Sequence, residues 1–130
     1  MKTLLLDSYV LHWLADEPER LTAPALAAIE RADELAVAGP TWCELAWLHL
    51  HGRLQAQLPL RAWLDQLARD VRTLPLTPAI AVRAAQLPDS FPRDPSDRVI
   101  FATAIESGLR LVTRDDRMRA HDPGAQTVIW

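Results

Sequence analysis

The sequence predicts an α/β fold: a three-layer sandwich in which helices flank a mostly parallel central sheet. Short apolar runs without helical spacing, the first at 3–6, are typical of strands buried in such a sheet. Segments with apolar residues at three- and four-residue spacing alternate with these runs, which favours parallel strands joined by helices. The chain has 130 residues, enough to bury one core, so we expect a single domain over 1–130.

Caps and breakers set the expected elements in the first half of the chain. Pro18 ends the first helix within the polar stretch 15–20. Thr22 is a favourable capping residue, and Pro24 shortly after it is typical of a helix start. Gly52 is a natural end for the last helix of this half. The expected order is a strand at 3–6, helices at 8–14 and 22–33, a strand at 34–38 and a helix at 41–51.

The second half begins with an amphipathic helix. Its apolar residues at helical spacing are Leu60, Trp63, Leu64 and Leu67. Thr77-Pro78 and Asp94-Pro95 each combine a cap with a proline and predict two further helices, separated by a proline-bounded loop. The expected order is a helix at 58–70, a strand at 71–74, helices at 77–86 and 94–107, and strands at 109–113 and 127–129.

Composition narrows the class of protein. The net charge of −3 gives no electrostatic indication of nucleic-acid binding, so local arginines and a metal would have to attract a polyanion. Cys43 is the only cysteine, which leaves no internal disulfide and no sign of an oxidising compartment. No run approaches the roughly 20 apolar residues of a membrane span, and the apolar stretch before Asp7 is too short for a signal peptide. We therefore expect a cytoplasmic protein without a membrane association.

Four acidic residues fall where ligands bind in α/β sheets, near the carboxyl ends of strands. Asp7 ends the first strand, and Asp115 lies two residues beyond the run 111–113. Glu44 and Asp97 stand in the first turns of helices and can face the same edge. Crowded carboxylates repel one another, so a shared pocket makes physical sense mainly when a divalent cation holds them. Mg²⁺ and Mn²⁺ prefer such oxygen ligands and can activate a water for attack on a phosphodiester.

These acids also have structural explanations. Thr41 precedes Glu44 by three positions, which is the spacing of a capping box. Asp94 and Asp97 repeat that spacing. Asp7 can cap the helix that follows it, although a carboxylate beside a buried strand is costly unless it is paired, capping or bound to a cation. The coincidence of four acids at one edge favours a functional site over four separate caps.

Several motifs occur in an order that is specific to one family. They are Leu-Leu-Leu-Asp-Ser at 4–8, Trp-Cys-Glu-Leu-Ala at 42–46, His-Gly-Arg-Leu at 51–54, Leu-Thr-Pro at 76–78, Arg-Asp-Pro-Ser-Asp-Arg at 93–98, Leu-Val-Thr-Arg-Asp at 111–115 and Val-Ile-Trp at 128–130. With these motifs the chain resembles PIN-domain proteins over nearly its whole length, and specifically the VapC-like toxins of bacterial and archaeal toxin-antitoxin pairs. The Asp-Pro-x-Asp-Arg and Thr-x-Asp elements are the most specific parts of the resemblance.

The resemblance implies a metal-dependent endoribonuclease, the toxin of such a pair, with Mg²⁺ or Mn²⁺ as cofactor. Asp7, Glu44, Asp97 and Asp115 match the four acids of the family site. We expect Asp7 and Asp97 to hold the metal most directly, with the other two as further ligands, partly through water. A metal-bound water with a lowered pKa would attack an RNA phosphodiester. The resemblance also implies a homodimer and a small VapB-like antitoxin whose tail lies across the acidic groove.

Other polar residues are expected to support this site. Ser8 and Thr113 can hydrogen-bond the carboxylates or the attacking water, and Asp94 matches an additional aspartate of this subgroup. The Thr-x-Asp register selects Asp115, whereas a shift of one residue would select Asp116. Adjacent aspartates after a strand are also typical of a solvated turn.

Arginines cluster around the third and fourth acids: Arg93, Arg98, Arg114, Arg117 and Arg119. We expect Arg93, Arg98 and Arg114 to contact RNA, with a solvated or salt-bridged surface as the alternative. The four histidines are scattered, which disfavours a histidine-zinc site. Two other functions use the same scaffold: a non-catalytic binding module, which the complete set of acids disfavours, and a DNA-directed nuclease.

Overall fold

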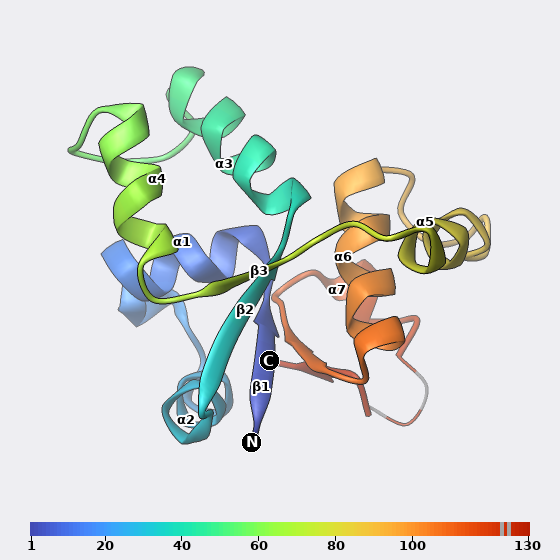
Figure 1. Ribbon diagram of the computed structural model, residues 1–130. Helices are drawn as coiled ribbons and strands as arrows, with labels where there is room; N and C mark the ends of the chain where they lie inside the picture. Colours follow the sequence, from blue (N-terminus) through green and yellow to red (C-terminus); the bar gives the residue numbers. More distant parts are fainter. Residues whose placement is uncertain (123, 125) are drawn as a thin grey trace.

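The computed structural model describes residues 1–122, 124 and 126–130 and confirms the three-layer α/β sandwich (Figure 1). Its five strands are β1 (Thr3–Leu6), β2 (Glu34–Ala38), β3 (Arg72–Leu74), β4 (Arg110–Val112) and β5 (Val128–Ile129). They form one sheet in the order β3-β2-β1-β4-β5, and every neighbouring pair is parallel. The apolar runs therefore pair as strands buried in a parallel sheet, as their composition predicts.

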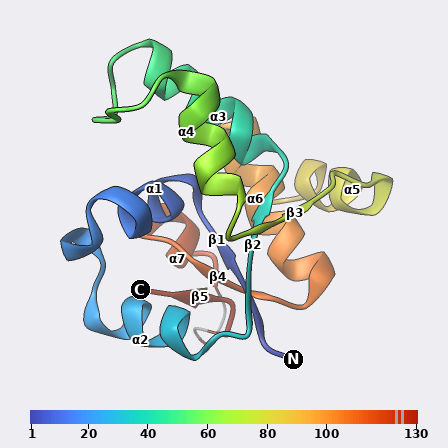
Figure 2. The ribbon, with the colours of Figure 1, turned by 60° about the vertical axis from the view of Figure 1, so that its left-hand side comes forward.

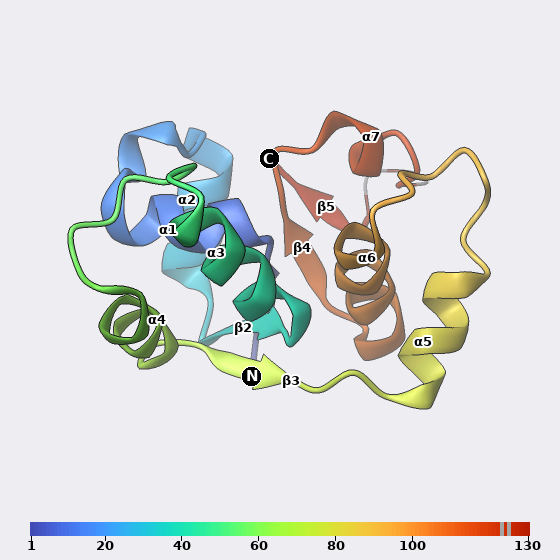
Figure 3. The same cartoon turned by 90° about the horizontal axis from the view of Figure 1, so that it is seen from above.

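Helices cover both faces of this sheet. They are α1 (Ser8–Asp16), α2 (Ala23–Arg31), α3 (Pro40–Leu50), α4 (Leu60–Ala68), α5 (Pro78–Ala85), α6 (Pro95–Ser107) and α7 (Asp116–Arg119), with a 3₁₀ turn at Pro18–Arg20. α1, α2 and α4 pack on one face, and α6 and α7 pack on the other, with α5 against the outer side of α6 (Figures 2 and 3). No helix within the described ranges is long and apolar enough to cross a membrane.

The central strand β1 joins the two cores because its side chains alternate between the faces. Leu4 and Leu6 pack against α1, α2 and α4, whereas Leu5 packs against α6 with Ile100 and Phe101. All five side chains are at most 3% exposed. Full burial of an aliphatic side chain stabilises a fold by about 1.5–3 kcal/mol, so both cores hold β1 in register.

The strand order changes direction beside β1. The chain proceeds from β1 through β2 to β3 toward one edge, and then places β4 and β5 on the other side of β1. In open α/β sheets, ligands bind at the carboxyl ends of the strands at such a switch point. Asp7 follows β1 directly and Thr113 follows β4, so both residues lie at this crevice.

The structure departs from the expected elements mainly at helix ends. α3 begins at Pro40, and its N-cap is Gly39, so Thr41 does not form the expected capping box. α4 is shorter than 58–70 because Pro59 stands at its N-cap. The 3₁₀ turn at Pro18–Arg20 and the helix α7 were not expected, since three or four residues are too few to show a hydrophobic period.

Candidate active site

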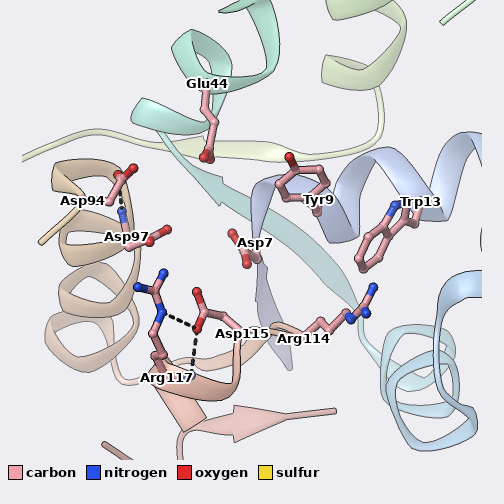
Figure 4. A pocket seen from close by; sticks show the side chains of 9 residues that line it. All are labelled: Asp7, Tyr9, Trp13, Glu44, Asp94, Asp97, Arg114, Asp115 and Arg117. Carbon is pink, nitrogen blue, oxygen red and sulfur yellow. Dashed lines mark hydrogen bonds and ion pairs between the residues drawn. The ribbon is translucent and has the colours of Figure 1, made fainter. Parts of the chain in front are cut away.

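The carboxyl ends of β1 and β4 open into a cavity of about 440 Å³ (Figure 4). Its lining residues are Asp7, Tyr9, Trp13, Glu44, Asp94, Asp97, Arg114, Asp115 and Arg117. The set includes all four of the acids that the sequence singled out. Asp7 and Asp97 thus face one cavity although ninety positions separate them in the chain.

Asp7 is fixed from two sides. The Ser8 backbone N–H donates to Asp7 Oδ1 over 2.7 Å, and Thr113 Oγ1 donates to Asp7 Oδ2 over 2.6 Å. Burial raises the pKa of Asp7, the two hydrogen bonds oppose that rise, and the charges of Asp115 and Asp94 add to it. Asp7 therefore does cap α1, as the structural explanation required, and at the same time it faces the cavity.

Thr113 connects the acids at the ends of β1 and β4. Its buried hydroxyl donates to Asp7 and accepts a hydrogen bond from the Asp115 backbone N–H over 3.1 Å. A threonine hydroxyl has one proton, so the donation to Asp7 leaves only its lone pairs for the Asp115 N–H. This orientation fixes the turn that carries Asp115 relative to Asp7. Thr113 thus has the supporting position predicted for it.

Glu44 projects into the cavity from α3 and is not part of a cap. Thr41 is fully buried, and its Oγ1 lies 3.0 Å from Ser8 Oγ, which donates to it. Burial raises the pKa of Glu44; contact with Ser8 opposes the rise, and the charge of Asp7 adds to it. The capping-box explanation for Glu44 is wrong, because the N-cap of α3 is Gly39 and no side chain caps that end of the helix.

Asp94 and Asp97 reach the cavity from the start of α6. Asp94 Oδ1 accepts from the backbone N–H groups of Ser96 (2.8 Å) and Asp97 (3.3 Å), so Asp94 is the N-cap. Burial is the main cause that raises the pKa of Asp97 to about 7, and the charges of Asp94, Asp7 and Glu44 contribute. A carboxyl with such a pKa is half protonated at neutral pH unless a cation neutralises its neighbours.

Of two adjacent aspartates, the one that the Thr-x-Asp register selected lines the cavity. Asp115 lines the cavity and caps α7, with Oδ1 accepting from the N–H groups of Arg117 (2.8 Å) and Met118 (3.2 Å). Asp116 is not among the lining residues; its side chain is 91% exposed and pairs with Arg119 over 3.0 Å. The solvated-turn explanation therefore holds for Asp116 and not for Asp115.

The three arginines expected to contact RNA have different surroundings. Arg98 is a correction: its guanidinium donates to the backbone carbonyls of five residues, which are Ala84, Leu87, Pro88, Phe91 and Pro92. It holds the loop before α6 and has little capacity left for phosphate. Arg93 is exposed but lies outside the acidic cavity, in a separate depression with Asp89 and Arg98. Of these three arginines, Arg114 alone lines the cavity with the acids.

Three lining residues were missed as site residues by sequence reasoning: Tyr9, Trp13 and Arg117. Tyr9 and Trp13 are four positions apart on α1, so they lie on the same side of the helix that follows Asp7. Their spacing after the first acid was the available signal. Arg117 Nε lies 3.8 Å from Asp115 Oδ1, at the opposite side of the cavity from Trp13 (Figure 4).

The donor set of the cavity is chemically suited to a hard divalent cation. Its acidic groups offer only carboxylate oxygens, and the pKa values of Asp7, Glu44 and Asp97 are all raised, so added positive charge would relieve a repulsion. Among residues 1–122, 124 and 126–130, no three His, Cys, Asp or Glu side chains are already gathered closely enough to hold an ion. The carboxylates surround the cavity without meeting at one point.

Comparison with known proteins agrees with this architecture. A model of the PIN domain family matches residues 4–122. The ribonuclease VapC22 of Mycobacterium tuberculosis is 53% identical over 130 residues, which is 100% of both chains. The VapBC-5 toxin-antitoxin structure from M. tuberculosis matches with 25% identity, a TM-score of 0.62, and coverage of 98% of this chain and 96% of that chain. VapBC2 from Rickettsia felis, bound to a promoter DNA fragment, matches with 11% identity, a TM-score of 0.70, and coverage of 97% and 96%. The chain therefore belongs to the PIN-domain family and is of the VapC type.

Proposed function

We propose that this protein is an endoribonuclease, the toxin of a toxin-antitoxin pair, with an active site that depends on Mg²⁺ or Mn²⁺. The observation that carries the proposal is the convergence of Asp7, Glu44, Asp94, Asp97 and Asp115 on one cavity at the switch point of the sheet. The ribonuclease name of the 53% identical relative supports the reaction, and the toxin-antitoxin complexes of similar fold support the biological role.

Asp7 and Asp97 would hold the cation most directly, with Glu44 and Asp115 as further ligands, partly through water. Because these carboxylates are not gathered around one point, binding would require the exposed side-chain oxygens to draw together. Asp7 is the fixed member, since both of its oxygens already accept hydrogen bonds. A bound cation of this kind lowers the pKa of water and stabilises negative charge on a phosphodiester under attack.

The residues of the chain position the acids and balance their charge. Thr113 holds Asp7 and the Asp115 turn together, which fixes two acids relative to each other. Asp97, whose pKa is raised to about 7 in the metal-free cavity, would give up its proton when the cation binds. Arg114 and Arg117 offset the negative charge of the cavity, which a phosphodiester must approach.

The partners in this proposal are RNA, a small VapB-like antitoxin and a second copy of the chain in the cytoplasm. Exposed apolar side chains support the protein contacts: Trp47 and Leu50 on α3, Leu76, and Val82 on α5 are each more than half exposed. Light scattering of the purified protein, alone and with the antitoxin encoded by an adjacent gene, measures both associations. A monomer at micromolar concentration would contradict the homodimer.

Cleavage of structured RNA, including tRNA, by the purified protein tests the proposed activity. The native chain, Asp7→Asn and Asp97→Asn are compared with Mg²⁺, Mn²⁺ and EDTA, and Asp116→Asn is the matched control because Asp116 is an exposed neighbour of the site. We expect cleavage only with a cation, losses of more than about 100-fold in the two site variants, and unchanged activity in the control.

Each alternative gives a different result. Equal cleavage by Asp97→Asn and the native chain would place the activity elsewhere or in a contaminant. Binding of RNA without cleavage under any cation would indicate a non-catalytic module, and preferential cleavage of single-stranded DNA would indicate a DNA-directed nuclease. Growth arrest on induction, relieved by the antitoxin, separates a toxin from a housekeeping nuclease.

A further inference from the structure

The wall of the cavity on the α1 side differs in chemistry from the acidic remainder. It is formed by Tyr9, Trp13 and Arg114, whereas the acids come from the other sides (Figure 4). The Tyr9 and Trp13 rings pack with their centroids 5.7 Å apart, and the Arg114 guanidinium lies 5.8 Å from the Trp13 centroid. This cation-π contact holds a long side chain at the edge of the acidic site.

Of the two arginines that line the cavity in the described part of the chain, Arg114 is the one without an ion pair. Arg117 is beside Asp115, at 3.8 Å. Arg114 makes no ion pair with any described residue; its interaction there is with the Trp13 ring, and its side chain is exposed. A guanidinium held on an aromatic face keeps its five N–H donors, which match the geometry of phosphate oxygens.

The aromatic residues have different roles in this wall. Trp13 is only 8% exposed, and besides Arg114 it contacts Arg20 and Trp130, so it is a support. Tyr9 is 38% exposed and offers its ring to the cavity. An exposed tyrosine and an exposed guanidinium that both contact the Trp13 ring combine a surface for a base with a donor for phosphate.

We propose that Tyr9, Trp13 and Arg114 form a nucleotide subsite that binds an unpaired RNA nucleotide next to the scissile phosphate, with Arg114 on its phosphate and the Tyr9 ring against its base. The subsite rests on the proposed ribonuclease function and adds a direction to it: the strand leaves the acidic centre along α1. Its partner must be single-stranded at this nucleotide, because a paired base cannot present its face to a side chain.

Binding of a short fluorescein-labelled single-stranded RNA tests the subsite, by anisotropy in Mg²⁺ with Asp97→Asn as the non-cleaving parent. We expect Tyr9→Leu and Arg114→Gln, each added to the parent, to weaken Kd by about 5- to 30-fold. Tyr9→Phe keeps the ring, and Arg93→Gln removes an exposed arginine outside the cavity, so both controls should stay within about twofold. Thermal unfolding verifies that each variant is folded.

Two further readouts separate contact with RNA from a structural effect. For a single strand, loss of one phosphate contact lowers the slope of log Kd against log salt by about 0.7, which we expect for Arg114→Gln and not for Tyr9→Leu. An abasic position moved along the RNA should remove the Tyr9→Leu penalty at one nucleotide only. If Tyr9→Leu does not fold, two measurements still decide: the salt slope of Arg114→Gln, and the loss of affinity of the Asp97→Asn parent at one abasic position.

The outcomes distinguish the subsite from the activity. If the native chain cuts RNA and the parent binds it, but Tyr9→Leu and Arg114→Gln bind within twofold of the parent, the subsite is overturned and the ribonuclease proposal stands. An unchanged salt slope in Arg114→Gln also overturns the phosphate contact. If the parent binds no RNA and the native chain cuts none with Mg²⁺ or Mn²⁺, both proposals fail together.

Discussion

Substitution of Asp97 by asparagine is expected to remove activity and yet to stabilise the metal-free protein above neutral pH. The pKa of Asp97 is raised from 3.8 to about 7, mainly by burial and then by Asp94, Asp7 and Glu44. Between these two values the folded state binds more protons than the unfolded state, so stability falls as pH rises. The contribution of the protonated carboxyl is fully present below about 3.8 and is lost by the time the pH exceeds about 7.

The size of the effect follows from the shift. A difference of about 3 pKa units corresponds to about 4 kcal/mol at about 1.36 kcal/mol per unit. Asp97 keeps partial contact with water, which screens the repulsion, so we expect about half of that value in the folded protein. Asp97→Asn should therefore raise the free energy of unfolding by about 2 kcal/mol at pH 8 and by almost nothing at pH 4.

Urea unfolding in EDTA at pH 4 and pH 8 measures this difference for the native chain, Asp97→Asn and Asp116→Asn. Asp116 carries the same change of charge on a 91% exposed side chain, so its substitution should leave stability nearly unchanged at both pH values. Mg²⁺ should then stabilise the native chain and not Asp97→Asn. A gain of equal size at both pH values, or a loss at pH 8, would refute the argument from carboxylate repulsion.

Three other substitutions test how the site and the fold are held. Thr113→Val removes the hydrogen bond to Asp7 and should lower the free energy of unfolding by about 1–3 kcal/mol and the rate of RNA cleavage at least tenfold. Thr113→Ser keeps the hydroxyl and should retain most of the stability and most of the activity. Arg98→Ala leaves several loop carbonyls without a donor and should cost about 2–3 kcal/mol, against less than about 0.5 kcal/mol for the exposed Arg93→Ala; equal effects would contradict the structural role. Ile100→Ala, at a side chain with 0% exposure, should lower the free energy of unfolding by about 2–5 kcal/mol. A smaller loss would show that the core closes the space left by the removed side-chain atoms.

The strands could be predicted from the sequence because burial on both faces leaves a simple signature. Residues 4–6 are all leucine, and such a run fits only a position that two cores cover. The sheet order was not predictable in the same way, since pairing of β1 with both β2 and β4 depends on contacts distant in the chain. Helix starts were predictable where a side chain caps, at Thr22 and Thr77, and wrong at Thr41, whose hydroxyl bonds Ser8 instead.

The acids of the site could be located from the sequence, but their surroundings could not. Asp7 and Asp115 follow strands and Asp97 stands in the first turn of α6, whereas Glu44 is the fifth residue of α3 and not in the first turn expected for it. Arg98 shows the opposite case: its position beside Asp97 suggested RNA, and only the folded loop supplies the carbonyls that occupy its donors. Tyr9 and Trp13 were missed because an aromatic pair at helical spacing has the same pattern whether it packs in a core or lines a cavity.

Three aspartates both cap a helix and line the cavity, because a cap uses only one of the two oxygens of each carboxylate. In Asp94 and Asp115, a single oxygen accepts both of the backbone N–H groups at the helix start, and in Asp7 the capping bond also uses one oxygen. Capping therefore orients each side chain and leaves its second carboxylate oxygen outside the cap. Because α1 and α6 begin at Asp7 and Asp94, which line the cavity, their N-terminal N–H groups also bring partial positive charge to it. That charge makes a cluster of acids tolerable in the folded chain. The pKa of Asp97 is still raised, by burial first and by the neighbouring acids second, and a cation would offset both effects.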